Sequence, residues 1–147
     1  MSVRTGDRGE GKLQVLNVAR ELKKYSLERV RSDKEFPKST RWLYANPIAT
    51  HVRGVCASIR YANSIYVNMT EEYVERRIAQ DRAYGHLESL LDLIEDAYLA
   101  GYISGERADT WTGHVDKTET LLRGWMKSDR EKYKKFIPRD DQPRVKF

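Results

Sequence analysis

Cysteine, proline and long apolar runs are scarce in this sequence, and each scarcity excludes a class of protein. Cys56 is the single cysteine among 147 residues, so no internal disulfide can form and a reducing compartment is indicated. No proline lies between Pro47 and Pro138, which favours long helices because proline breaks them. No apolar run approaches the roughly 18 residues of a membrane-spanning helix. These absences predict an all-α, cytoplasmic protein that does not associate with membranes.

The residue patterns of common catalytic and metal-binding sites are also missing. The sequence has no glycine-rich phosphate loop and no hydrolase-like pattern of Ser, His and Asp or of Cys and His. A di-iron bundle needs Glu-x-x-His on two helices, but the residues three positions before the histidines are Ile48, Ala83 and Trp111. Cys56 belongs to an apolar seam, and we interpret it as a packing residue. We therefore expect no catalytic residue, no metal and no cofactor.

Apolar residues recur at alternating intervals of four and three along most of the chain, which is the spacing of helices that pack in bundles. The first helix has a less regular stripe, formed by Leu13, Leu16, Ala19 or Arg20, Lys23 and Leu27. The three later seams consist of Ile48, Val52, Val55, Ile59, Ala62 and Tyr66, then Ala83, Leu87, Leu90, Ile94 and Ala97, then Trp111, Val115, Thr118, Leu122 and Trp125.

The ends of these helices follow from local signals. Phe36–Pro37 ends the first helix, expected at residues 13–34, because a residue before proline avoids the α region. The second helix starts at Asn46–Pro47 or is preceded by a turn from Lys38. The third helix is expected to start at Asn68 or Thr70, and Asn68 with Glu71 has the spacing of a capping box. Gly101 suits the residue that follows its end, and Ser104 suits the cap of a fourth helix that runs to Tyr133 or Lys135.

Short connections between sequential helices make them antiparallel. The predicted fold class is therefore an all-α, antiparallel up-down-up-down four-helix bundle. It is expected to occupy residues 13–135, with a flexible arm at residues 1–12 and a flexible tail at residues 136–147.

Charge is distributed unevenly although its net value is only +5. Residues 37–67 hold four basic residues and no acidic one, whereas residues 68–103 hold three basic and eight acidic residues. Arg53 and Arg60 are seven residues apart and so share one helix face, with small side chains between them. Arginines on a rigid helix suit phosphate contact. A second basic run attracts polyanions without sequence preference and consists of Lys127, Arg130, Lys132, Lys134 and Lys135.

Another interpretation of the same charges stays open. Arg53 and Arg60 can instead pair with acidic residues of the third helix, within one chain or between subunits. The acidic partners would be Glu88, Asp92, Glu95 and Asp96. In that case the protein is a structural or scaffolding bundle without a nucleic-acid role.

Two stretches resemble a known family. Residues 36–63, FPKSTRWLYANPIATHVRGVCASIRYAN, are similar to four-helix-bundle proteins encoded by intervening sequences of ribosomal RNA genes, through Phe36–Pro37, Ser58–Ile59 and Ala62–Asn63. Residues 73–104 and 114–126 resemble the third and fourth helices of Avd, the accessory variability determinant of diversity-generating retroelements, with Leu122–Arg123–Gly124–Trp125 as the most suggestive piece.

The Avd resemblance implies a function that composition alone does not show. Members form barrel-like homopentamers, bind DNA and RNA, and associate with a reverse transcriptase during mutagenic copying of a template RNA. They have no known active site. The basic residues of this chain that coincide with a nucleic-acid-binding role are Arg53, Arg60, Arg76, Arg77 and Arg82. Exposed aromatic residues such as Tyr61 or Tyr73 are candidates for docking the polymerase, although packing within the bundle is the favoured interpretation of a tyrosine here.

One enzymatic pattern remains as an alternative. Arg107 and His114 are separated by six residues, which resembles the R-x4–6-H signature of HEPN ribonucleases, another family of four-helix bundles. That resemblance implies RNA cleavage that depends on the histidine. Ala108 departs from the family's pattern, in which a polar residue usually follows the arginine.

Overall fold

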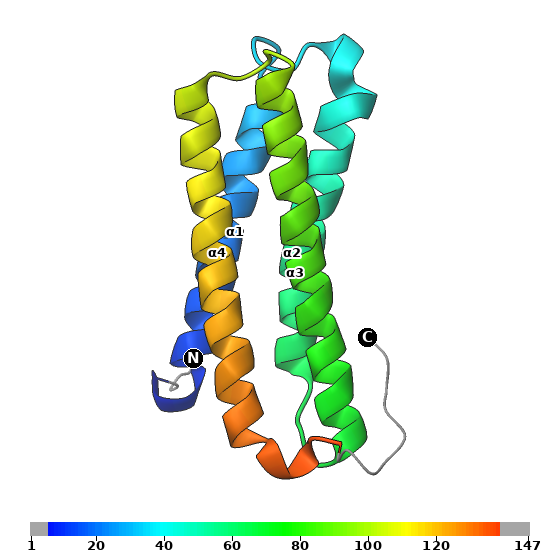
Figure 1. Cartoon of the computed structure of the whole chain (residues 1–147), viewed down its shortest axis with the longest axis vertical. Coiled ribbons are helices and arrows are strands. Elements are labelled where there is room, and N and C mark those ends of the chain that lie inside the picture. Colours follow the sequence, from blue (N-terminus) through cyan, green and yellow to red (C-terminus); the bar gives the residue numbers. More distant parts are fainter. Residues whose placement is uncertain (1–5, 139–147) are drawn as a thin grey trace.

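The computed structural model describes residues 6–138, with side chains from residue 14 onward. Within this range it is helical, without strands, and its four long helices are α1 (Gly6–Arg31), α2 (Asn46–Ser64), α3 (Thr70–Leu99) and α4 (Gly105–Lys132). The helices lie along the long axis of a bundle, and the chain returns at each connection, as the colours of Figure 1 show. The prediction of a four-helix, all-α protein is therefore confirmed.

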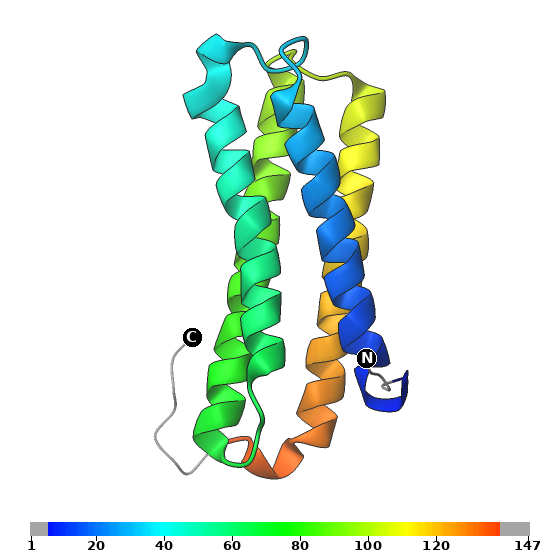
Figure 2. The same ribbon diagram turned by 180° about the vertical axis from the view of Figure 1, so that it is seen from behind.

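Each helix packs mainly against two others, in the pairs α1–α2, α2–α3, α3–α4 and α1–α4. Helices α2 and α4 consequently lie diagonally across the bundle. Figure 1 has α3 and α4 toward the viewer, and Figure 2 shows α1 and α2 from behind. No described helix is both long and apolar enough to cross a membrane.

The start of α1 differs from the expected arm at residues 1–12. The helix begins at Gly6, because a helix that is already nucleated gains one hydrogen bond for each further residue it fixes. Residues 1–5, and residues 139–147 of the expected tail, lie outside the described residues. The first residue of the expected tail, Phe136, is described and ends a short 3₁₀ helix, Lys134–Phe136.

Helical turns from Lys38 precede α2, so the second of the two expected starts is the one observed. A 3₁₀ turn (Lys38–Thr40) leads into a π-helical turn (Arg41–Ala45) and then into α2. The capping signals of α4 and α3 are confirmed in part. Ser104 Oγ accepts a hydrogen bond from Arg107 N at 3.0 Å, and Gly101 has a φ of 88°.

The capping box expected from Asn68 and Glu71 does not form. Helix α3 begins at Thr70 after Met69, without a side-chain cap. Asn68 N instead donates to Glu72 Oε1 at 2.7 Å. Glu72, one residue after the expected Glu71, therefore satisfies this backbone amide.

The apolar seams of α3 and α4 are buried as predicted, and those of α1 and α2 need correction. Tyr66 is 82% exposed because α2 ends before it, at Ser64. In α1 the expected stripe is displaced: Arg20 is exposed, and Leu16, Lys23 and Leu27 are only partly buried. The core side of α1 consists instead of Val15, Val18, Ala19, Leu22 and Ser26.

A buried polar network joins three helices at the end of the bundle where α4 finishes. Arg76 Nε lies 2.6 Å from Asp129 Oδ2 and Arg76 Nη2 lies 3.0 Å from Oδ1. Gln80 Nε2 donates to the same carboxylate at 2.8 Å, and Arg76 Nη1 donates to the carbonyl of Ile65 at 3.1 Å. Arg76 is only 3% exposed and also lies over the Trp125 ring. The network thus ties α4 to α3 and to the end of α2.

Removing one partner of this network should destabilise the fold strongly. Asp129→Ala leaves the Arg76 charge buried without a counter-ion, so we expect the free energy of unfolding to fall by roughly 3–5 kcal/mol. Denaturant unfolding followed by circular dichroism measures the loss. Asp81→Ala is the matched control, since it breaks the partly exposed pair with Arg77 and should cost less than about 1 kcal/mol. Equal losses in the two variants would contradict the prediction.

Candidate nucleic-acid interface

Arg53 and Arg60 lie on the outer face of α2, where both side chains are exposed. Neither forms an ion pair within the described part of the chain. The expected alternative, in which they pair with acidic residues of α3 in the same chain, is therefore not what the structure has. Two guanidinium groups that are seven residues apart remain free to contact an anion.

Helix α1 adds two more cations to this surface. Cys56 Sγ lies 3.5 Å from the carbonyl oxygen of Ala19, which packs α1 against α2. Burial raises the pKa of the Cys56 thiol, and the charges of Lys23, Arg20 and Arg60 oppose that rise. All three cations are thus close to one point of the α1–α2 seam.

We call the surface formed by Arg20, Lys23, Arg53 and Arg60 the α1–α2 basic face; the two helices that carry it are nearer the viewer in Figure 2. Sequence reasoning missed Arg20 and Lys23 because they were assigned to the inner stripe of the first helix. The available signal was that residues 37–67 contain no acidic residue. A helix without acidic residues was therefore available to form a basic surface together with Arg20 and Lys23.

A small residue separates the arginines of α2. Ala57 lies between them, Ser64 follows Arg60 on the same side, and both are exposed. Proteins hold the phosphate backbone through arginine and lysine side chains and through backbone or hydroxyl groups. The α1–α2 basic face offers these groups together.

Arg76, predicted as a nucleic-acid contact, is only 3% exposed. Its guanidinium is paired with the Asp129 carboxylate and donates to the Ile65 carbonyl, so its charge is already balanced inside the bundle. The sequence does not show this, because Asp129 is 53 residues away from Arg76.

The two other predicted arginines of α3 are less buried than Arg76. Arg77 Nε is 3.3 Å from Asp81 Oδ1, so its charge is already paired. Arg82 is exposed. It lies near Tyr61, whose hydroxyl donates to Glu75. The bond to Glu75 raises the pKa of Tyr61, and the charge of Arg82 opposes the rise.

The basic run at the end of α4 is exposed but forms a separate region. It consists of Lys127, Arg130, Lys132, Lys134 and Lys135. Helix α4 lies diagonally opposite α2, but Lys132 at its end lines a pocket together with Asn63 and Ser64 at the end of α2. Tyr73, expected as an exposed docking residue, is buried, with its ring 6.2 Å from that of Tyr133. Tyr61 is exposed as expected.

The two residues of the ribonuclease-like pattern are both held against α1. Arg107 Nε donates to Glu35 Oε2 at 2.8 Å, and Arg107 Nη1 donates to Tyr25 Oη at 3.3 Å. His114 packs on the Tyr25 ring, with 4.8 Å between the ring centroids. The arginine charge is therefore paired with a carboxylate, and the pair has a structural explanation in the contact of α1 with α4.

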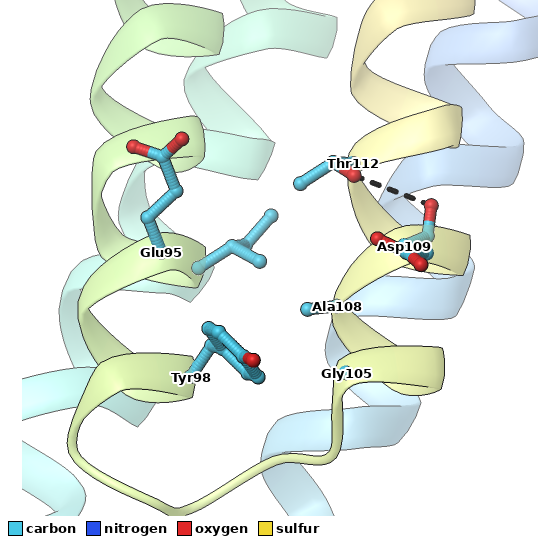
Figure 3. Close-up of a pocket in the computed structure, with 7 residues that line it drawn as sticks. Glu95, Tyr98, Gly105, Ala108, Asp109 and Thr112 are labelled. Atoms are coloured by element: carbon cyan, nitrogen blue, oxygen red, sulfur yellow. Dashed lines mark hydrogen bonds between the residues drawn. The ribbon is translucent and has the colours of Figure 1, made fainter.

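A pocket of about 310 Å³ lies on the other side of the bundle, between α3 and α4. Figure 3 shows Glu95 and Tyr98 on α3 facing Gly105, Ala108 and Asp109 on α4. The small residues of α4 leave the space, and the two carboxylates give it negative charge. We call this pocket and its rim the α3–α4 acidic pocket.

A buried carboxyl group, that of Glu119 on α4, lies nearer the middle of the same helix than the pocket does. Glu119 is 5% exposed, and its Oε2 has no hydrogen-bond partner. Burial raises the pKa of Glu119 to about 7, and the neighbouring carboxyl of Glu88 adds to the rise. Arg123 Nη2, 3.5 Å from Glu119 Oε1, opposes it. Near neutral pH, Glu119 is therefore partly protonated.

Comparisons with protein-family models, curated proteins and solved structures found no match to this chain. In the part of the chain that the structure describes, no three or more His, Cys, Asp or Glu side chains gather in a way that could hold a metal ion.

Glu119 should make stability depend on pH. Its pKa in the folded protein, about 7, is above the ordinary value of 4.5, so the folded state binds this proton more tightly than the unfolded state does. That stabilisation is complete below the ordinary pKa and is lost as the pH rises through about 7. We expect Glu119→Gln to lack this loss and to be more stable than wild type by roughly 1–3 kcal/mol at about pH 8.

Chemical denaturation between about pH 5 and pH 8 measures this difference. Glu131→Gln, the same substitution at an exposed position of α4, is the control and should follow wild type. A Glu119→Gln variant whose stability changes with pH in parallel with wild type would contradict the prediction.

Proposed function

We propose that this protein is a nucleic-acid-binding accessory factor of a reverse transcriptase, of the Avd type found in diversity-generating retroelements. It would act in the cytoplasm, without enzymatic activity of its own, and support mutagenic copying of a template RNA. The observation that carries the nucleic-acid part is the α1–α2 basic face, where Arg53 and Arg60 are exposed and unpaired within the described residues.

The chemistry of that face favours binding to the phosphate backbone rather than to particular bases. Guanidinium and ammonium groups neutralise phosphates and release counter-ions, which gives affinity without sequence preference. The basic run from Lys127 to Lys135 adds a second cationic region at one end of the bundle. A long RNA or DNA can contact both regions, whereas a short one contacts a single region.

Half of the ten residues that carry the family resemblance are packing residues. Phe36, Ile59, Ala62, Leu122 and Trp125 are all buried. Their burial supports the part of the resemblance that concerns how an up-down-up-down bundle packs. The homopentamer and the reverse-transcriptase partner come from the resemblance itself.

The α3–α4 acidic pocket favours a basic protein partner on the side opposite the nucleic acid. A polymerase that holds RNA and DNA carries positive surface, and opposite charges steer encounter and suppress wrong partners. We therefore assign polymerase docking to the α3–α4 side, near Glu95 and Asp109, and leave the α1–α2 basic face to nucleic acid.

Binding to a structured RNA across a salt series tests the first assignment. Each phosphate contact that is lost should lower the steepness of log K against log salt by about 0.9 for duplex or about 0.7 for single strands. We expect Arg53→Glu/Arg60→Glu to bind more weakly and with a shallower slope than wild type. Fluorescence anisotropy of a labelled RNA measures both quantities.

Lys38→Glu/Arg41→Glu is the matched control, because it makes the same change of net charge at exposed residues outside the proposed site. It should lose less affinity than the α2 variant. Equal losses would mean that only net charge matters, and absence of binding by wild type at moderate salt would remove the nucleic-acid proposal. Cleavage of the RNA that is abolished by His114→Ala would favour the ribonuclease alternative instead.

The scaffolding alternative makes a different prediction about assembly. If the basic face of one copy meets the acidic pocket of the next, Arg53→Glu/Arg60→Glu and Glu95→Lys/Asp109→Lys should each dissociate the oligomer, and mixing the two variants should restore it. Our proposal expects a homo-oligomer, by the resemblance a pentamer, whose mass is unchanged in both variants. Native mass spectrometry or light scattering decides between these outcomes.

A further inference from the structure

Two histidines from different helices meet across the α2–α3 seam. His51 Nδ1 and His86 Nδ1 are 3.0 Å apart, and the ring centroids are separated by 5.3 Å with an angle of 53° between the rings. Both side chains are partly buried. In the absence of any other ligand, one ring donates its Nδ1–H to the lone pair of the other. The two histidines are 35 residues apart in the chain, so no local sequence motif predicts their contact.

Gly54 makes room for this pair. A Cβ atom at position 54 would lie only 2.6 Å from Cε1 and Nε2 of His86 and 2.7 Å from its Cδ2. The imidazole of His86 thus occupies the space directly over the α2 backbone, one turn from His51. No larger residue at position 54 would leave the ring where it is.

The separation of the two Nδ1 atoms matches that of two ligands on one metal ion. With metal–nitrogen distances of about 2.05 Å, two imidazole nitrogens lie about 2.9 Å apart at a right angle and about 3.3 Å apart at a tetrahedral angle. The observed 3.0 Å is within this range and closer to the right-angled arrangement, which Cu²⁺ and Ni²⁺ favour. Little movement of the helices is needed to place an ion between the rings.

The surroundings of His86 favour the form of its imidazole that binds metals. The next turns of the two helices present apolar groups to the core, among them Val55 and Leu90, which are fully buried. Burial lowers the pKa of His86, and the charge of His51 adds to that effect. Neutral imidazole is the metal-binding form of histidine.

We propose that His51 and His86 form a two-histidine chelate for a divalent late first-row transition metal, Cu²⁺ more tightly than Zn²⁺, through both Nδ1 atoms. Binding requires no oxidation or reduction. The proton now in the N–H···N bond moves to Nε2 of the same ring through solvent, and each Nδ1 gives its lone pair to the ion. Water fills the remaining coordination positions, since no third protein ligand gathers there within the described residues. Such an ion would link α2 to α3 and is independent of the nucleic-acid proposal.

Calorimetric titration of the full chain with Cu²⁺ alone and with Zn²⁺ alone tests this. We expect one equivalent bound, with Cu²⁺ the tighter. His51→Asn and His86→Asn keep a polar group of similar reach but should each weaken binding by at least about tenfold, a loss seen even when only a partner of a metal ligand is changed. His114→Asn is the matched control and should bind like wild type, because His114 packs on Tyr25 of α1.

Gly54→Ala is a second test that leaves both imidazoles in place. Alanine favours the helix, so α2 persists, but its Cβ displaces the ring of His86 and should weaken binding. The electron paramagnetic resonance spectrum of the Cu²⁺ complex should show coupling to two imidazole nitrogens, and to fewer in either single-histidine variant.

Three results would overturn the proposal. They are no bound metal in wild type, unchanged affinity in His51→Asn/His86→Asn, and unchanged affinity in Gly54→Ala. Any of them would leave the two histidines as a hydrogen-bonded pair that only joins the helices.

Discussion

The buried ion pair between Arg76 and Asp129 is the contact on which the arrangement of this bundle depends most. A buried guanidinium is costly to desolvate, so it persists only where every donor finds an acceptor. Here the acceptors come from α4, through Asp129, and from the end of α2, through the Ile65 carbonyl. The pair therefore requires a particular register of three helices, which apolar seams alone specify less strictly because neighbouring turns of a heptad pattern are nearly equivalent.

That register separates two surfaces of opposite charge. With α2 held between α1 and α3, its acid-free outer face adjoins Arg20 and Lys23 of α1, and the α1–α2 basic face results. The acidic half of α3 adjoins the start of α4 on the other side, where small residues leave a pocket. A protein with two such surfaces can hold a polyanion and a basic partner at once, which is what an accessory factor of a polymerase needs.

The polar residues inside the bundle illustrate what a single sequence conceals. Arg76 and Arg77 are adjacent in the chain and look alike as candidates for phosphate contact, yet one is buried and the other is at the surface. Adjacent residues on a helix are about 100° apart around its axis, so a small difference in the inward direction exchanges their roles. The stripe of α1 was misjudged for the same reason.

Other features were accessible because their causes are local. Gly101 ends α3 in the left-handed region that glycine adopts without strain, and Ser104 caps α4 with its own hydroxyl. The seams of α3 and α4 repeat regularly enough to locate their buried faces. The lack of acidic residues in residues 37–67 also showed that α2 is basic, although pairing of Arg53 and Arg60 with acidic residues of α3 stayed open.

The sequence by itself thus determined the number of helices, most of their ends, the buried faces of α3 and α4, and the basic character of α2. These properties follow from backbone preferences and from the periodicity of apolar residues within one helix. Only the tertiary structure decided that Arg76 is internal, that α1 adds Arg20 and Lys23 to the basic face, and that His51 meets His86. Each of these depends on which helices are neighbours and at what height they pack, and no pattern within a single helix contains that information.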